Sequence, residues 1–572
     1  MKTCLAMVLC LLSTTALATS PGLRIVDLQR CGDLLADDRL HWCLRAEGLG
    51  PGQPTLWLGE RRVPQKAAQR HGDRIEFSLD GASATSAALW LEQGDQRSNP
   101  VWLTRQRSHV RAAGADAVAK NMDGLDTYVD LVSLLIEERH DGRETAKRIA
   151  RKYGAEVVGG IPPLNVYQLK LPVDDLLQRD AMVLRMGSET SVDAVIIEES
   201  APEGDSEASG DSSASLEQAV EWAANRFMDA QYFYQRRMSA SPIPLATVRM
   251  GIIERDVDFD QPAFAGYLGP CTAGGCLYAR DARRSGGHGA HVAGVVAASG
   301  EAGQSGFLSG LGKAGPRFEI IVERNSDAGI TANIAASVNL VEDGVRVLNW
   351  SWGVHRIGAR DVRDEEVDSL VRSGLAINGY EELLEEFFLW LQREHPDVVV
   401  VNSAGNGASW TSADDYRLPS SLLTDQLLVV GGHQRSDEAV PLEHPRHVTK
   451  RKSSNVDRRV DISAAACLKP HGGAEIHCGT SYATPLVSAT VAVMLAINPQ
   501  LSPAQVRMLL RRSALSMGPR QDFEAADADD LTAPILPSER EGQFDHPDLG
   551  RSARLDMRKA LELAMQSRTR VR

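Results

Sequence analysis

The feature of this sequence that most constrains its fold is an alternation of short apolar runs with helix-like runs after Ala246. The short runs cover residues 251–253, 345–348, 398–401 and 427–430, and the helix-like runs include 292–298 and 381–392. Such alternation is typical of a parallel sheet whose two faces are covered by helices. We therefore predict an α/β domain over residues 216–572, with functional side chains at the carboxyl ends of its strands.

Two smaller units are predicted ahead of this domain, because 572 residues are too many for one ordinary core. Between residues 19 and 105, short alternating segments such as 54–58, 75–79 and 88–91 are separated by glycine, proline and aspartate. This pattern is typical of a small β-sandwich. Residues 125–200 follow the order strand, helix, strand, strand, helix, strand, which is that of a ferredoxin-like α+β fold.

Two other segments lack the pattern of a folded unit. Residues 1–18 combine Lys2, an apolar centre and a small-residue cleavage site ending at Ala18, which indicates an export signal. Residues 201–215 are acidic and rich in serine, and we predict a cleavable linker there. No later apolar run is predicted to cross a bilayer. We therefore expect a secreted or periplasmic protein with no membrane contact after signal removal.

Charge and cysteine content restrict the ligands further. The formal net charge is −14, so a polyanion would be repelled and nucleic acid is not an expected partner. Six cysteines outside the signal form three pairs of near neighbours, namely Cys31 with Cys43, Cys271 with Cys276, and Cys467 with Cys478. Such pairing is typical of disulfides in an oxidising compartment, whereas a zinc site would need ligand spacings that are missing. We expect no metal centre and no organic cofactor, and leave structural calcium open.

Four junctions of the predicted α/β domain carry side chains able to do chemistry. They are the acids Glu254, Asp256 and Asp258 after the strand at 248–253, His288 at the start of a helix, Asn406 after the strand at 398–401, and Ser481 ahead of the apolar helix at 486–497. A serine hydroxyl becomes a good nucleophile when an imidazole accepts its proton, and an acid must orient that imidazole. A backbone N–H near Ser481 and the Asn406 amide could stabilise the resulting oxyanion.

The sequence around these residues resembles the signatures of the subtilase family. The run His288-Gly-Ala-His-Val-Ala-Gly is similar to its histidine motif, and Gly-Thr-Ser481-Tyr-Ala-Thr-Pro is similar to its serine motif. Ser351, Trp352 and Gly353 lie in a segment similar to the family's substrate-binding strand, and Asn406 lies in one similar to its oxyanion segment. The resemblance covers roughly residues 246–560, with the motifs in the family's order.

This resemblance implies a serine endopeptidase that hydrolyses peptide bonds through an acyl-enzyme on Ser481. In that reading His288 is the base, Asn406 stabilises the oxyanion, and the backbone of Ser351, Trp352 and Gly353 binds an extended polypeptide. The resemblance also implies a precursor in which residues 125–200 form an inhibitory pro-domain. We expect the protein to be a monomer.

One departure from the family pattern concerns the orienting acid. Where the family has Asp-Thr-Gly after its first strand, this chain has Glu254-Arg255-Asp256. Glu254 is our leading hypothesis for the acid, because it carries the same charge on a longer side chain, and Asp256 and Asp258 are the alternatives. The rival functions are a catalytically impaired, peptide-binding pseudoenzyme and an esterase that uses the same triad.

Overall fold

The computed structural model describes most of the chain. The described residues are 22–31, 39–80, 85–199, 218–240, 245–271, 275–282, 287–300, 305–312, 318–324, 328–360, 366–367, 371–409, 417–436, 439–455, 459–469, 476–517 and 553–569. The predicted signal at 1–18 and the predicted linker at 201–215 lie outside these ranges.

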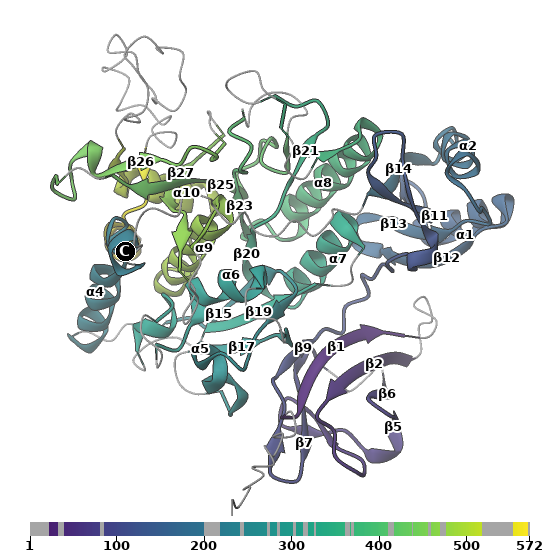
Figure 1. Ribbon diagram of the computed structural model, residues 1–572, viewed down its shortest axis with the longest axis horizontal. Helices are drawn as coiled ribbons and strands as arrows, with labels where there is room; N and C mark the ends of the chain where they lie inside the picture. Colours follow the sequence, from purple (N-terminus) through teal and green to yellow (C-terminus); the bar gives the residue numbers. More distant parts are fainter. Residues whose placement is uncertain are drawn as a thin grey trace, which may run out of the picture.

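The second half of the chain is built on a large, mostly parallel sheet (Figure 1). Its strands, in spatial order, are β17 (Gly275–Tyr278), β19 (Phe318–Glu323), β15 (Val248–Ile253), β20 (Val345–Trp350), β23 (Val399–Ser403), β25 (Leu427–Arg435), β27 (Ile462–Ala465), β31 (Ala553–Arg554) and β30 (Leu515–Ser516). From β17 to β31 each neighbouring pair is parallel, while β30 and the short β26 (Val448–Lys450) are antiparallel to their neighbours. The predicted α/β sheet is thus confirmed.

Helices cover both faces of this sheet, and the strand residues alternate between the two cores. One face packs on α6 (His288–Ala297), α9 (Thr480–Ile497), α4 (Phe227–Ala240), α10 (Pro503–Ser513) and α11 (Met557–Thr569), and the other packs on α7 (Gly329–Glu342) and α8 (Gly374–Glu394). In β23, for example, Val399 and Val401 join the first core while Val400 joins the second. This two-sided burial explains why the strands read as unbroken apolar runs.

Helix α9 corrects one expectation from the sequence. Among the described residues it is long and apolar enough to cross a membrane by length and composition, although no such run was expected after the signal. However, 94% of the stretch is buried inside the protein. Its apolar character is therefore that of a central core helix, packed against five strands of the sheet and α6.

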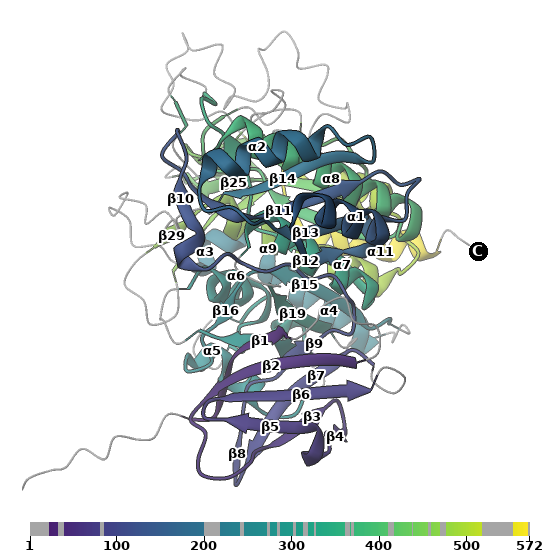
Figure 2. The ribbon, with the colours of Figure 1, turned by 90° about the vertical axis from the view of Figure 1, so that its right-hand side faces the viewer.

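The first unit of the chain consists of two antiparallel sheets around one core (Figure 2). One sheet contains β1 (Arg24–Arg30), β2 (Arg39–Glu47), β6 (Arg74–Asp80) and β5 (Ala68–His71), and the other contains β4 (Arg61–Arg62), β3 (Thr55–Leu58), β7 (Ala87–Gln93), β8 (Gln96–Arg97) and β9 (Val101–Leu103). The unit is fixed to the large domain by polar contacts. Arg24 Nε lies 3.0 Å from Asp281, and Trp102 donates to Asp343 at 2.9 Å.

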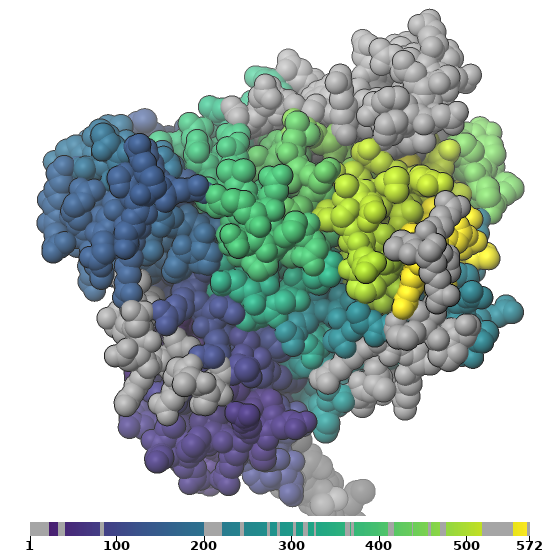
Figure 3. Space-filling model, turned by 180° about the vertical axis from the view of Figure 1, so that it is seen from behind, coloured from purple at the N-terminus to yellow at the C-terminus, as the bar shows by residue number. Residues whose placement is uncertain are grey.

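The second unit, residues 118–199, is an antiparallel sheet with two helices on one face. Its elements are β10 (Val118–Lys120), β11 (Asp126–Ile136), α1 (Gly142–Tyr153), β12 (Glu156–Ile161), β13 (Val166–Lys170), α2 (Leu176–Gly187) and β14 (Val192–Glu199). The spatial order is β12, β13, β11, β14. Its other face shares a hydrophobic core with α7 and α8, so the unit lies directly against the large domain (Figure 3).

Three disulfides join the cysteines in the predicted pairs, Cys31–Cys43, Cys271–Cys276 and Cys467–Cys478. The third links β28 (Cys467–Leu468) to β29 (His477–Cys478), immediately ahead of α9. It therefore closes a short loop that leads directly into the segment carrying Ser481.

Candidate active site

The predicted site residues meet at one edge of the large sheet. Glu254 directly follows β15, Ser351 follows β20, and Asn406 lies three residues after β23. Because the carboxyl ends of parallel strands face the same edge, these three segments lie together there. His288 and Ser481 come to the same edge at the beginnings of α6 and α9.

Glu254 is the acid that reaches the histidine. Its Oε1 lies 2.9 Å from Nδ1 of His288, and the side chains are 12% and 32% exposed, respectively. The close approach of α6 to this loop depends on the residue after the histidine, since a Cβ at Gly289 would lie 2.6 Å from the Asp256 carbonyl oxygen. The absence of a side chain at Gly289 thus allows Glu254 and His288 to meet.

The two alternative acids occupy other positions. Asp258 is buried and accepts hydrogen bonds from the Asp260 backbone N–H at 3.0 Å and from the Gln261 amide at 3.4 Å. Asp256 lies in β16 (Asp256–Val257), which pairs with β18 (Arg280–Asp281). The geometry thus favours Glu254 over Asp256 and Asp258 as the partner of His288.

Electrostatics at this pair favour a basic imidazole. Burial by itself lowers the pKa of His288, but the charge of Glu254 and the hydrogen bond that it accepts raise that pKa above the ordinary value. With Nδ1 bound to Glu254, Nε2 is the ring nitrogen left to exchange a proton. This is the arrangement that a general base requires.

Ser481 lies in the first turn of α9 and is partly exposed. Its hydroxyl donates to the Ser351 carbonyl at 3.1 Å, and the Ser351 hydroxyl donates back to the Ser481 carbonyl at 2.8 Å. Because a hydroxyl has one proton, the serine in this conformation does not donate to His288. A rotation of the Ser481 side chain is needed to form that bond, as is common for unliganded sites.

Asn406 is oriented by the residue before the serine. Its Oδ1 accepts from the Thr480 backbone N–H at 2.9 Å and from the Thr480 hydroxyl at 3.2 Å. The amide nitrogen is therefore left to donate, and it lies 3.1 Å from where a Cβ would stand on Gly479. Thr480 was not singled out from the sequence, although its place directly before Ser481 was a signal available to find it.

Asn402 holds the backbone of the segment 351–353 in place. Its side-chain amide donates to the carbonyls of Trp350 and Trp352 at 2.9 and 2.8 Å. Trp350 is fully buried in the core, whereas Trp352 is partly exposed. Of the two tryptophans, Trp352 is therefore the one that solvent can reach.

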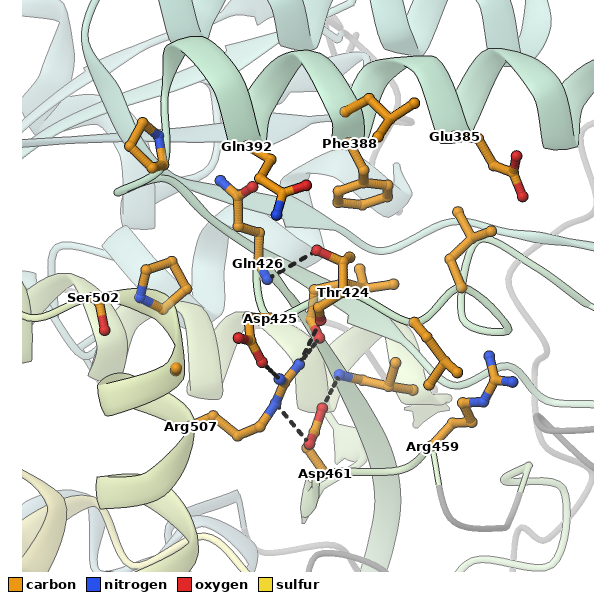
Figure 4. Close-up of a pocket in the computed structure, with 18 of the residues that line it drawn as sticks. Glu385, Phe388, Gln392, Thr424, Asp425, Gln426, Arg459, Asp461, Ser502 and Arg507 are labelled. Atoms are coloured by element: carbon orange, nitrogen blue, oxygen red, sulfur yellow. Dashed lines mark hydrogen bonds and ion pairs between the residues drawn. The ribbon is translucent and has the colours of Figure 1, made fainter.

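A large hollow of about 1360 Å³ lies elsewhere, at the amino ends of β23, β25 and β27 (Figure 4). Among its charged side chains, Asp461 accepts a hydrogen bond from Arg511 at 2.8 Å and forms an ion pair with Arg507 Nε at 3.0 Å. Because Glu254 and Asn406 lie at the opposite, carboxyl edge of the sheet, this hollow is separate from the candidate site.

Comparison with known proteins identifies relatives of the large domain. Residues 252–543 match the sequence model of the subtilase family. The cell wall-associated protease of Bacillus subtilis (strain 168) is 27% identical over 289 residues, which cover 49% of this chain and 26% of that protein. The chain thus aligns with about a quarter of that relative's length.

Two solved structures show more distant similarity. Fervidolysin from Fervidobacterium pennivorans, a keratinolytic enzyme related to subtilisin, has 15% sequence identity and a TM-score of 0.46, covering 81% of this chain and 64% of that one. The patellamide maturation protease PatA has 20% identity and a TM-score of 0.34, covering 56% and 99%, respectively. The family match itself extends over just over half of the 572 residues, and on this basis the chain belongs to the subtilase family.

Proposed function

We propose that this protein is an exported serine endopeptidase, made as a precursor, that cleaves polypeptides through an acyl-enzyme on Ser481. The observation that carries the proposal is the 2.9 Å contact between Glu254 and His288 at the sheet edge that also holds Ser481 and Asn406. An acid, a base, a nucleophile and an oxyanion donor are thus available in one place.

The reaction begins when Nε2 of His288 removes the Ser481 proton as Oγ attacks the peptide carbonyl carbon. The negative charge that develops on the carbonyl oxygen is stabilised by the Asn406 amide and by the Ser481 backbone N–H at the start of α9. His288 then gives its proton to the leaving amine as the C–N bond breaks. Water attacks the acyl-enzyme by the same steps, which release the acid and restore Ser481.

Glu254 takes the place of the acid that orients the base. Its hydrogen bond to Nδ1 fixes the imidazole tautomer and its charge stabilises the imidazolium that forms during each proton transfer. The longer side chain of glutamate is accommodated by the local geometry, in which the chain turns directly after β15 and the Glu254 N–H donates to Ile252 at 3.1 Å.

Residues 118–199 are proposed to act as the inhibitory pro-domain. Support comes from the last two residues of β14, whose carboxylates bind the beginnings of two helices of the large domain. Glu198 accepts from the Thr331 N–H at 2.9 Å in α7, and Glu199 accepts from the Ser373 N–H at 2.8 Å ahead of α8. The chain continues from there into the predicted linker, where cleavage would separate the unit from the protease.

A second candidate function is a peptide-binding pseudoenzyme. The observation that favours it is the Ser481 hydroxyl, which donates to Ser351 and not to His288. In that case the site would hold an extended chain without cutting it.

Active-site labelling distinguishes these functions. A fluorophosphonate reacts with a serine only where a base activates it, so we expect rapid labelling of the wild type and none of Ser481→Ala or His288→Ala. Turnover of casein in preference to a short acyl ester then separates a peptidase from an esterase. Absence of labelling in a folded wild type would support the pseudoenzyme.

A further inference from the structure

A buried arginine lies between the two backbone segments that flank the candidate nucleophile. Arg417 belongs to β24 (Arg417–Leu418), which pairs with β21 (Val354–Arg356), and its side chain extends between Gly353 and Gly405. A Cβ at Gly353 would lie 2.3 Å from the Arg417 Nη2, and a Cβ at Gly405 would lie 2.2 Å from its Nε. Glycine at both positions is what makes room for the guanidinium group.

The guanidinium is held by neutral partners only. Arg417 is 3% exposed, and Nη1 donates to the Ser403 carbonyl at 2.7 Å and to the Ser420 hydroxyl at 2.8 Å. Nη2 reaches the Ser403 hydroxyl at 3.3 Å, and Nε has no hydrogen-bond partner. Within the part of the chain that the structure describes, no carboxylate forms an ion pair with Arg417. Burial lowers the pKa of Arg417 to about 9.

The position of Arg417 relative to Ser481 determines which part of a bound substrate it could contact. The attacked carbonyl carbon has to lie about 3 Å from Oγ, with its oxygen at Asn406. Ser481 Oγ itself lies 3.1 Å from the carbonyl oxygen of Ser351. A residue that supplies this carbonyl therefore lies beside the segments 351–353 and 403–406, and Arg417 lies against both of these segments.

We propose that Arg417 makes this protease selective for aspartate or glutamate at the residue whose carbonyl Ser481 attacks. The inference rests on the proposed function, because it assumes that Ser481 acylates. A buried cation without a counter-ion is unfavourable, and a substrate carboxylate would supply the missing charge. Guanidinium groups bind carboxylates through two parallel hydrogen bonds, which adds geometric selectivity.

The test uses matched fluorogenic peptides that differ only at that residue, with glutamate, glutamine, leucine or alanine. We expect kcat/KM for the glutamate peptide to exceed that for the glutamine peptide by about 10- to 100-fold in the wild type. In Arg417→Met, which removes the charge and keeps most of the volume, the preference is expected to shift to leucine. Equal rates, or a wild-type preference for leucine, would overturn the inference.

A matched control is Arg554→Met. Arg554 is also a fully buried arginine bonded to backbone carbonyls, but it lies in β31, outside the site. Its replacement is expected to reduce stability and to leave the ratio of glutamate to leucine rates unchanged. A change in that ratio equal to the change in Arg417→Met would mean that Arg417 does not act directly on the substrate.

Fluorophosphonate labelling of every variant separates this inference from the proposed function. A wild type that is not labelled contradicts the peptidase proposal, whereas a labelled wild type without acidic preference contradicts only the role of Arg417. If Arg417→Met does not fold, the inference can be tested on the wild type alone, by comparing its inhibition by peptide aldehydes that end in glutamate or in glutamine. Stronger inhibition by the glutamate aldehyde supports the inference, and equal inhibition refutes it.

Discussion

Glutamates stand at the carboxyl ends of β14 and β15, and the two sets of carboxylates make different kinds of contact. Glu254 after β15 binds His288, a group that can take up and release a proton. Glu198 and Glu199 at the end of β14 bind groups that do not titrate near neutrality, the N–H and hydroxyl groups of Thr331 and Ser373 and, for Glu198, the Tyr380 hydroxyl. In the proposed function the first arrangement orients a base, while the second holds one unit of the chain against another.

Burial separates the two regions further. His288 is partly exposed at the sheet edge, where a substrate can reach it. Glu198 and Glu199 are 5% and 3% exposed, and burial raises the pKa of Glu198 even though three hydrogen bonds oppose this shift. The carboxylate beside His288 and the two carboxylates at the end of β14 thus differ in what they contact, and not in residue type.

The largest expected effect tests the catalytic half of this comparison. Replacement of Glu254 by glutamine keeps the size of the side chain but removes its charge and allows the wrong imidazole tautomer. We expect kcat/KM for peptide hydrolysis to fall by about 10⁴-fold, with Glu254→Ala similarly impaired. The control is Asp256→Asn, two residues further along in β16, which should retain most activity. Full hydrolysis by Glu254→Ala would show that another group orients His288.

A smaller loss is expected at the oxyanion donor. Asn406→Ala removes one hydrogen bond made to the developing negative charge, so kcat should fall by about 10²–10³-fold with little change in KM. Thr480→Val should lower kcat as well, by less, because it removes one of the two hydrogen bonds that orient Asn406. An equal rise in KM in place of the fall in kcat would indicate a role in ground-state binding.

The docking role of the carboxylates at the end of β14 is tested by measuring the free energy of unfolding. In a Ser481→Ala background, which prevents self-processing, Glu199→Ala leaves the Ser373 N–H without its acceptor and should destabilise the docked unit by about 1–3 kcal/mol. Chemical unfolding of the full chain measures this loss. Glu144→Gln, which alters an exposed carboxylate on α1, is the control and should change stability by less than about 0.5 kcal/mol. Similar effects of both substitutions would argue against a docking role.

The smallest expected effect is a shift in pH dependence. His288 acts as a base only when it is neutral, and Glu254 raises its pKa, so labelling should decline as the pH falls through a value above that of ordinary histidine. Removing the charge in Glu254→Gln lowers the pKa of His288 and should move this acid limb down by about one pH unit. An acid limb that does not move would mean that another group controls it.

Short sequence patterns were sufficient to predict those parts of the site that are formed by residues close together in the sequence. The strand at 248–253, the helix starting at His288 and the position of Glu254 all follow from short apolar and glycine-rich segments, and each is observed. The three disulfides were also predictable, because each closes a loop of few residues.

Contacts between distant segments could not be predicted in this way. Glu198 and Thr331 are 133 positions apart, and no local pattern marks a glutamate that will bind the start of another unit's helix. Arg417 is similar, because its place beside Gly353 and Gly405 depends on the pairing of β21 with β24. The hydrogen bond from Ser481 to Ser351 depends likewise on a side-chain conformation that the motif does not encode.

The most direct test of the central claim follows the mass of the protein expressed from Thr19 onward, beside its Ser481→Ala twin. If Ser481 is a working nucleophile and residues 118–199 are a pro-domain, the wild type will be cut near residues 201–216 while the twin stays at full length. If neither is cut, and neither reacts with the fluorophosphonate, the protein is not the self-processing peptidase proposed and the peptide-binding alternative is favoured.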